Sequence, residues 1–230
     1  MIYAIMCGMN LTALASATEF FRGFDPDEVE DLLFRLNGVG KSYRRDEIVI
    51  HAGLEARRIM VVASGRLHVY EDTLEGQSII VREIGPGEAL GLWIAHMPEK
   101  MCWPGDVVVA DEPCEIISLD MAAARRLMAS IEPRVARLAV NMSRILAREL
   151  FTTWRKLMVM DEQSIEARVQ MYLSELDNET GRTGSVVVPF NREHMAQYFG
   201  VSRPGLSRVL GQLRDRGLLT WRKNVFKIKF

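Results

Sequence analysis

The sequence lacks most of the features that mark secreted and membrane proteins. Its 230 residues include three cysteines, Cys7, Cys102 and Cys114, which are too few and too scattered for a disulfide framework. No run of 18 or more apolar residues occurs, so no membrane span is expected. No low-complexity tract occurs either, and with 48% hydrophobic and 26% charged residues the composition is that of a globular protein.

The N-terminal segment has no basic residue before Arg22. Residues 1–18 are uncharged and include Ala15-Ser16-Ala17, which resembles a signal-peptide cleavage site. A secretory signal needs a basic region ahead of its apolar stretch, and this segment has none. We therefore expect a cytoplasmic protein with no membrane partner.

Clustered catalytic and metal-ligating residues are also missing. Metal-dependent β-barrel enzymes of the cupin type need grouped His and carboxylate ligands. The four histidines, His51, His68, His96 and His194, show no His-x-His spacing, and no Ser/His/Asp or paired-carboxylate arrangement stands out. The sequence predicts no catalytic residue, no metal site and no enzyme. A cupin-like enzyme remains an alternative that an assay of metal-loaded protein would test.

Charge is distributed unevenly although the net charge is only -1. Residues 191–230 contain nine Lys or Arg against two acidic residues, whereas the rest of the chain contains twenty basic and twenty-eight acidic residues. A short basic segment joined to a larger acidic one favours a polyanionic partner at the C-terminal end.

Two types of periodicity follow one another along the chain. Residues 40–120 consist of short β-branched runs separated by glycine turns, which predicts an antiparallel β-roll or jelly roll. Apolar residues then recur every three or four positions from Ile131 to Met160, and a helix of that length spans roughly 45 Å. Such a long apolar stripe favours an intermolecular seam, with these candidate dimerisation residues: Val135, Leu138, Met142, Ile145 and Leu150.

The segment NREHMAQYFGVSRPGLSRVL predicts two short helices around Gly200, which supplies the positive φ of a tight turn. Asn191 and Ser202 can cap the two helices. In the second helix the leucines face inward, which leaves Arg203, Ser207 and Arg208 facing outward. This is a helix-turn-helix, whose second helix reads bases in the major groove of double-stranded DNA.

The following segment, LLTWRKNVFKIKF, alternates apolar and polar residues about a Lys-Asn turn and predicts a β-hairpin wing. Arg222 and Lys223 at its tip are suited to phosphate contact. The predicted DNA-contacting set consists of Arg192, Ser202, Arg203, Ser207, Arg208, Arg222 and Lys223.

From about residue 18 to 230 the chain resembles the Crp/Fnr family of bacterial transcription regulators, most specifically in NREHMAQYFGVSRPGLSRVLGQLRDRGLL. The resemblance implies an α+β fold with an effector-sensing β-roll over 1–130, a dimerisation helix over 131–160 and a winged helix-turn-helix over 161–230. It also implies a homodimer that binds palindromic promoter sites. If the protein activates transcription, the homodimer is expected to contact RNA polymerase. Pro204 stands where many members have a glutamate that reads cytosine, so the common target sequence is not assumed.

The effector is left open by the resemblance. Cyclic-nucleotide-binding members use glycine-glutamate and arginine-serine pairs, but here Leu92 follows Gly91 and Pro104-Gly105 takes the second place, so cyclic AMP is not expected. The iron–sulfur branch needs four cysteines, whereas haem stays open through His51, His68, His96 or Cys102. The candidate effector-pocket residues are Trp93, His96, Cys102 and Trp103. The alternative to an effector-controlled regulator is a ligand-independent regulator whose β-roll is purely structural.

Overall fold

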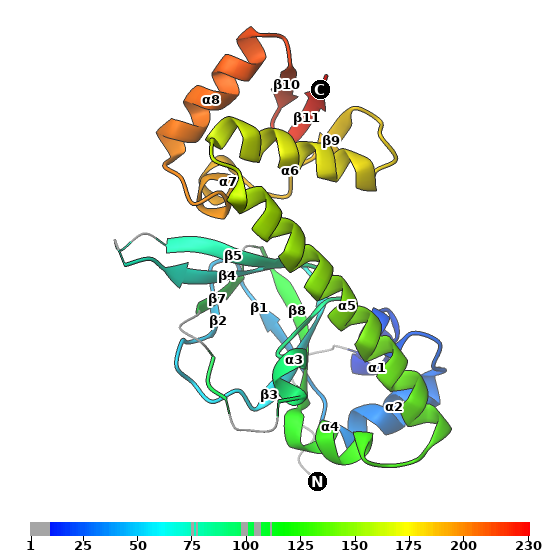
Figure 1. The fold of residues 1–230 in the computed structure, drawn as a ribbon. Helices are drawn as coiled ribbons and strands as arrows, with labels where there is room; N and C mark the ends of the chain where they lie inside the picture. Colours follow the sequence, from blue (N-terminus) through cyan, green and yellow to red (C-terminus); the bar gives the residue numbers. More distant parts are fainter. Residues whose placement is uncertain (1–9, 75, 77, 98–100, 104–106, 111) are drawn as a thin grey trace. The chain divides into compact units, whose positions relative to one another are not determined.

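The computed structural model describes residues 10–74, 76, 78–97, 101–103, 107–110 and 112–230. Within the described chain, contacts divide the protein into two compact units, Met1–Glu71 with Arg82–Leu150, and Asp72–Val81 with Phe151–Phe230. Figure 1 labels most of the helices and strands of both units. The predicted anchor position Pro104-Gly105 lies outside the described residues.

The β-roll consists of two four-stranded sheets, ordered β1-β8-β3-β6 and β2-β7-β4-β5. All strand pairs with a determined register are antiparallel. Burial alternates along the second half of β8, where Ile117 and Leu119 are fully buried and Ser118 and Asp120 are partly exposed, because successive side chains point to opposite faces. The predicted antiparallel β-roll is confirmed. Its strands are β1 (Val39–Tyr43), β2 (Ile48–Ile50), β3 (Arg58–Ser64), β4 (Leu67–Asp72), β5 (Ser78–Ile84), β6 (Ala89–Leu90), β7 (Val107–Ala110) and β8 (Cys114–Asp120).

Short helices flank the sheets of the first unit. They are α1 (Leu11–Ser16), the 3-10 turn η1 (Glu19–Phe21), α2 (Pro26–Arg35), α3 (Leu92–Ala95) and α4 (Met121–Met128). Helix α2 begins at a capping box, in which the Asp25 carboxylate accepts from the Glu28 amide and the Glu28 carboxylate accepts from the Asp25 amide. Asp120 caps α4 in a similar way by accepting from the Ala123 amide at 2.7 Å. No described helix combines the length and hydropathy that crossing a bilayer requires.

The long helix α5 extends over Pro133–Asp161, close to the predicted range of 131–160. One face of its first half packs inside the first unit. The Asn141 amide is buried and donates to the carbonyls of Phe20 and Arg22, at 3.2 and 2.8 Å. Arg137 donates to the carbonyl of Gly23 at 2.8 Å. These bonds join α5 to the segment that includes η1.

This packing corrects the predicted dimerisation residues. Val135, Leu138, Met142 and Ile145 are at most 4% exposed, because the chain itself covers them, so they cannot form an open seam. Leu150, the fifth residue of the set, is 70% exposed. Helix α5 therefore has two apolar faces, one buried in the first unit and one that continues along the second half of the helix.

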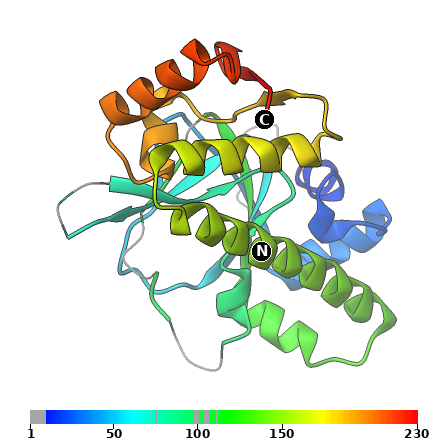
Figure 2. The same cartoon turned by 45° about the horizontal axis from the view of Figure 1, so that its top comes forward.

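The second unit contains a three-helix arrangement and a small sheet ordered β10-β11-β9. Helices α6 and α8 lie side by side in both views (Figures 1 and 2). Strand β9 joins the wing as a third strand, which was not predicted from the sequence. The elements are α6 (Ile165–Glu179), β9 (Ser185–Val187), α7 (Arg192–Tyr198), α8 (Arg203–Asp215), β10 (Leu219–Arg222) and β11 (Val225–Ile228).

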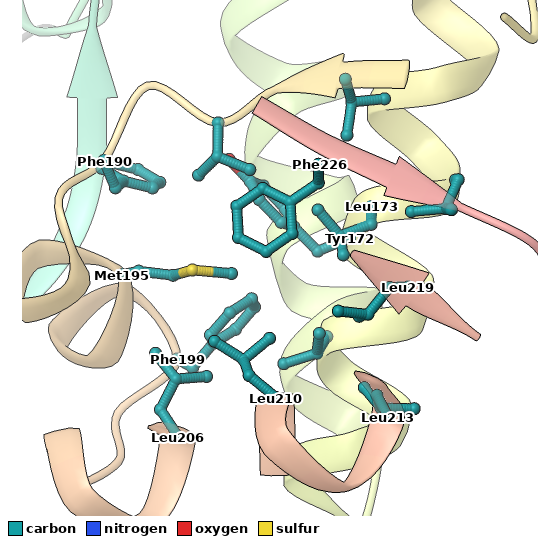
Figure 3. Packing of buried hydrophobic residues seen from close by; sticks show 14 of the residues in the cluster. Tyr172, Leu173, Phe190, Met195, Phe199, Leu206, Leu210, Leu213, Leu219 and Phe226 are labelled. Carbon is teal, nitrogen blue, oxygen red and sulfur yellow. The ribbon is translucent and has the colours of Figure 1, made fainter. Parts of the chain in front are cut away.

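One apolar core holds these elements together (Figure 3). Tyr172 of α6 lies edge-to-face with Phe199 at the end of α7, with ring centroids 5.5 Å apart. Leu206 and Leu210 of α8 and Phe226 of β11 are buried in the same cluster. Each helix and the wing therefore contributes side chains to one core, which fixes α8 relative to β10 and β11.

Candidate DNA-binding interface

The helix-turn-helix is built by local hydrogen bonds in the way the sequence predicts. Asn191 caps α7 by accepting from the His194 amide at 2.9 Å, and Ser202 caps α8 by accepting from the Gly205 amide at 3.2 Å. Gly200 between the helices has φ of +62°, a conformation that glycine adopts without strain. The Val201 amide donates to the Ala196 carbonyl at 3.0 Å and closes the turn.

Helix α8 is amphipathic across its whole length. Leu206, Leu210 and Leu213 are buried, whereas Arg203, Ser207 and Arg208 are exposed, as predicted. Arg203 lies 3.7 Å from Glu193 of α7, a loose ion pair between largely exposed groups. Arg208 forms no ion pair with any residue that the structure describes. The exposed side of α8 therefore presents one free guanidinium and one that is only weakly held.

The wing presents two further basic groups at its tip. Strands β10 and β11 are antiparallel, and Arg222 is paired with Val225 across the hairpin. Arg222 and Lys223 are exposed, and Lys223 has φ of +56° in the turn itself. The predicted hairpin and its Lys-Asn turn are confirmed.

Arg192 has a different environment from the other predicted contacts. Its guanidinium lies 4.7 Å from the centre of the Phe226 ring and 5.2 Å from that of Trp221, and it donates to the sulfur of Met195. Burial lowers the pKa of Arg192 below the usual arginine value. The side chain therefore connects the start of α7 to both strands of the wing. The sequence gives no signal for this contact, since the aromatic partners lie about thirty residues away.

The predicted effector-pocket residues differ in how far they are exposed. Trp103 is buried and packs on Gly91, where an added β-carbon would lie 3.0 Å from the ring. Trp93 is half-buried, but His96 and Cys102 are exposed. A common effector pocket lined by these four residues stays a prediction.

Charged residues that the sequence analysis missed are buried in the first unit instead. Arg82 of β5 forms an ion pair with Glu149 of α5, and their side chains are only 16% and 13% exposed. Burial raises the pKa of Glu149 above the usual glutamate range, although Arg82 opposes that shift. The adjacent charged residues Arg82 and Glu83 in the otherwise apolar run IIVREI are the sequence feature from which a buried charged site could have been predicted.

The candidate haem ligands lie in unlike environments. His68 is fully buried, with Nε2 at 3.5 Å from Glu83 and Nδ1 at 3.4 Å from the Tyr70 hydroxyl. His51 and His96 are exposed, and His96 contacts the Leu92 carbonyl at 2.9 Å. Among the described residues no three His, Cys, Asp or Glu side chains gather as metal ligands.

Comparison with known proteins adds two family matches. Residues 40–130 match the cyclic nucleotide-binding domain, and residues 167–229 match the Crp-like helix-turn-helix domain. The cAMP-activated global transcriptional regulator CRP of Pasteurella multocida is 24% identical over 181 residues, which are 77% of this chain and 84% of the relative. Electron transport regulator A of Shewanella oneidensis is 19% identical over 197 residues, 84% of this chain and 74% of the relative.

Solved structures share the fold. The c-di-GMP-responsive global regulator CLP of Xanthomonas campestris superimposes with a TM-score of 0.71 at 20% identity, covering 90% of this chain and 100% of that one. A CooA mutant from Carboxydothermus hydrogenoformans gives a TM-score of 0.68 at 17% identity, covering 87% and 86%.

The two family matches occur in the order β-roll and then helix-turn-helix, together they cover two thirds of the chain, and the curated relatives named above are regulators. The second unit has a capped recognition helix with exposed arginines and a basic wing. The chain therefore belongs to the Crp/Fnr family and is a DNA-binding transcription regulator.

Proposed function

We propose that this protein acts as a homodimer in the bacterial cytoplasm and binds palindromic promoter DNA, with α8 of each subunit in the major groove. The observation that carries this proposal is the exposed, partner-free Arg208 on the outward side of α8. Arginine is the side chain best suited to guanine, because its fork of donors matches the O6 and N7 acceptors. As an activator the dimer would also contact RNA polymerase.

The wing supports a second type of contact. Arg222 and Lys223 are exposed at the hairpin tip, on the strands that share a core with α8. Charged groups on a short turn suit the phosphate backbone, which carries no base-specific information. We infer that the wing contacts contribute affinity for DNA of any sequence, whereas the α8 contacts determine which base sequence is preferred.

The second half of α5 is the dimer face in this proposal. Its exposed apolar residues recur every three or four positions along the helix, the spacing of a seam between helices. They are Leu150, Phe151, Trp154, Leu157 and Met158, each at least 45% exposed. A two-fold seam of this type sets the two α8 helices about one turn of DNA apart, near 10 base pairs.

The test is a binding-site selection followed by affinity measurements across salt concentrations. Arg208→Ala should cost about 1–3 kcal/mol per half-site and relax the preference at one base position. Lys223→Ala should weaken binding to all sequences alike and lower the salt slope by about one per subunit. Arg45→Ala, at an exposed ion pair with Asp46 in the first unit, is the matched control and should change neither.

The two variants could also exchange their effects. If Arg208→Ala left the selected motif unchanged while Lys223→Ala altered it, the assignment of α8 as the recognition helix would be wrong.

A further inference from the structure

We propose that Pro204 is a specificity-determining residue of α8 and that its ring selects a thymine methyl group in each half-site. The inference rests on the proposed function, in that α8 must enter the major groove. It goes beyond the proposed function because it assigns base recognition to a side chain that has no hydrogen-bonding group.

The helical geometry of α8 places Pro204 on the line farthest from the core. Residues 204, 208, 211 and 215 are spaced by four, three and four, so they form one stripe on a helix of 3.6 residues per turn. The buried Leu206 and Leu210 have the same spacing two residues on, which is about 200° around the axis. The stripe therefore points directly away from the core.

Only one group on this outward stripe is free to donate hydrogen bonds to bases. Gly211 has no side chain, and a β-carbon added there would meet nothing within 4 Å. Asp215 at the far end is 3.1 Å from Arg214, and its carboxylate would be repelled by DNA phosphates. The Arg208 guanidinium thus has the Pro204 ring on one side and bare backbone on the other.

Pro204 occupies the first turn of α8, where its position is well fixed. The helix begins at the Ser202 cap, and Pro204 is the second helical residue. A proline there is also favoured simply for starting a helix. Its ring nevertheless stays exposed at the end of the helix that enters the groove first, and it has no polar atom that could pair with a base edge.

The chemistry of the groove indicates what such a ring can recognise. In the major groove the thymine C5-methyl is the apolar feature of the base edges, and apolar side chains contact it. A cytosine at that position would instead leave its amino group facing a proline without an acceptor. Burying one methyl group corresponds to a discrimination of about fourfold per half-site.

The experiment starts from the motif that the wild-type protein selects and replaces each thymine of one half-site by uracil, which removes only the methyl group. We expect one thymine per half-site whose replacement weakens binding about fourfold, and we expect Pro204→Ala to reduce that sensitivity. Pro204→Glu should switch the selected base at the same position to cytosine, since a carboxylate accepts from the cytosine amino group. Glutamate in the first turn is also compatible with the helix dipole, and equal thermal midpoints would verify folding.

Thr220→Glu is the matched control, because it adds the same charge at an exposed position of β10, outside α8. It should weaken binding to all sequences without changing the motif. The proposal is overturned if no thymine is sensitive to loss of its methyl group, or if Pro204→Glu selects the wild-type motif. Failure of the proposed function has a different signature: the wild-type protein would select no motif at all, and both proposals would fall.

Discussion

Arg35 and Glu132 form a bidentate ion pair in the first unit, with oxygen–nitrogen distances of 2.7 and 2.8 Å. The hydrogen bonds from Arg35 lower the pKa of Glu132 to about 2. A carboxyl whose pKa is lower in the folded state stabilises the fold above its unfolded pKa, and this contribution disappears as the pH falls through the folded value. Glu132→Gln should therefore lower the thermal midpoint at pH 7, and the difference from wild type should shrink between pH 4.5 and 2. A difference that stays constant over that range would contradict the assigned pairing.

Lys156 shows the opposite type of titration in the second unit. Its amine donates to the Ile80 carbonyl and lies 4.2 Å from the centre of the Tyr198 ring. Burial lowers the pKa of Lys156 to about 8. The unfolded chain holds this proton up to about pH 10.5, so the cost of burying the charge is full below pH 8 and is relieved as the pH rises above it.

The wild-type protein should therefore gain stability relative to Lys156→Met between pH 8 and 10, by at most about 3 kcal/mol. Denaturant unfolding of both proteins at each pH gives the difference, in which the titration of all other groups cancels. Parallel pH profiles would show that the amine is not desolvated. Lys41→Met, which removes a lysine that lies over Tyr43 in the first unit, is the control for the loss of a lysine–aromatic contact.

Single residues differ in how well the sequence predicts them. The caps at Asn191 and Ser202 and the positive φ of Gly200 depend on neighbours three or four residues away, and the sequence analysis found all three. Lys156 and Arg192 depend on partners tens of residues away. No local pattern indicates such partners, so their burial could not be predicted.

Among the secondary-structure elements, strand β5 and helix α5 are joined by the buried Arg82–Glu149 pair. Breaking a buried pair from one side leaves an uncompensated charge, whereas removing both sides is often neutral. Arg82→Met should destabilise the protein by about 3 kcal/mol at pH 8, and the double variant Arg82→Met with Glu149→Met should be close to wild type.

The pH gives an independent check on this pair. Without Arg82 the pKa of Glu149 rises further. When folding raises the pKa of a carboxyl group, the folded protein becomes less stable as the pH increases. The deficit of Arg82→Met in denaturant unfolding should thus be larger at pH 8 than at pH 5. A deficit that is independent of pH would mean that lost packing, and not the unpaired carboxylate, is responsible.

Helix α5 also shows what hydrophobic periodicity predicts and what it leaves open. Its existence and its limits were predicted to within two residues, because 29 residues of helical periodicity are a strong signal. Periodicity identifies an apolar face but not what covers it. The first-half residues Leu138 and Met142 are covered by the chain itself, which requires tertiary contacts such as Asn141 with the Phe20 carbonyl.

For the whole molecule, the sequence predicted the order of β-roll, long helix and winged helix-turn-helix, and the structure has that order. It predicted a boundary at residue 160, whereas the two compact units divide at Leu150 and Phe151, and the segment Asp72–Val81 belongs to the second unit. A boundary drawn from periodicity follows the chain, but compact units follow contacts between distant segments. The Lys156 bond to Ile80 is one such contact.

The proposed dimer gives the prediction at this scale. Trp154→Glu with Leu157→Glu should convert the protein to a 26.1 kDa monomer in sedimentation and abolish tight DNA binding together. Phe34→Glu, which charges an aromatic that is 67% exposed on α2, is the matched control and should remain dimeric. A wild-type protein that sediments only as a monomer at micromolar concentration would refute the dimer itself.

The placement of the tryptophans gives the protein an optical readout of its own assembly. Trp154 is 56% exposed on the proposed dimer face, whereas Trp103 is 5% exposed inside the β-roll. An indole emits at longer wavelength in water than in an apolar environment. Dilution that separates two subunits would therefore shift the emission of Trp154 to the red while that of Trp103 stays constant. In the proposed dimer, Trp154 would thus report subunit association and Trp103 would serve as an internal reference, once the other two tryptophans, Trp93 and Trp221, are replaced by phenylalanine.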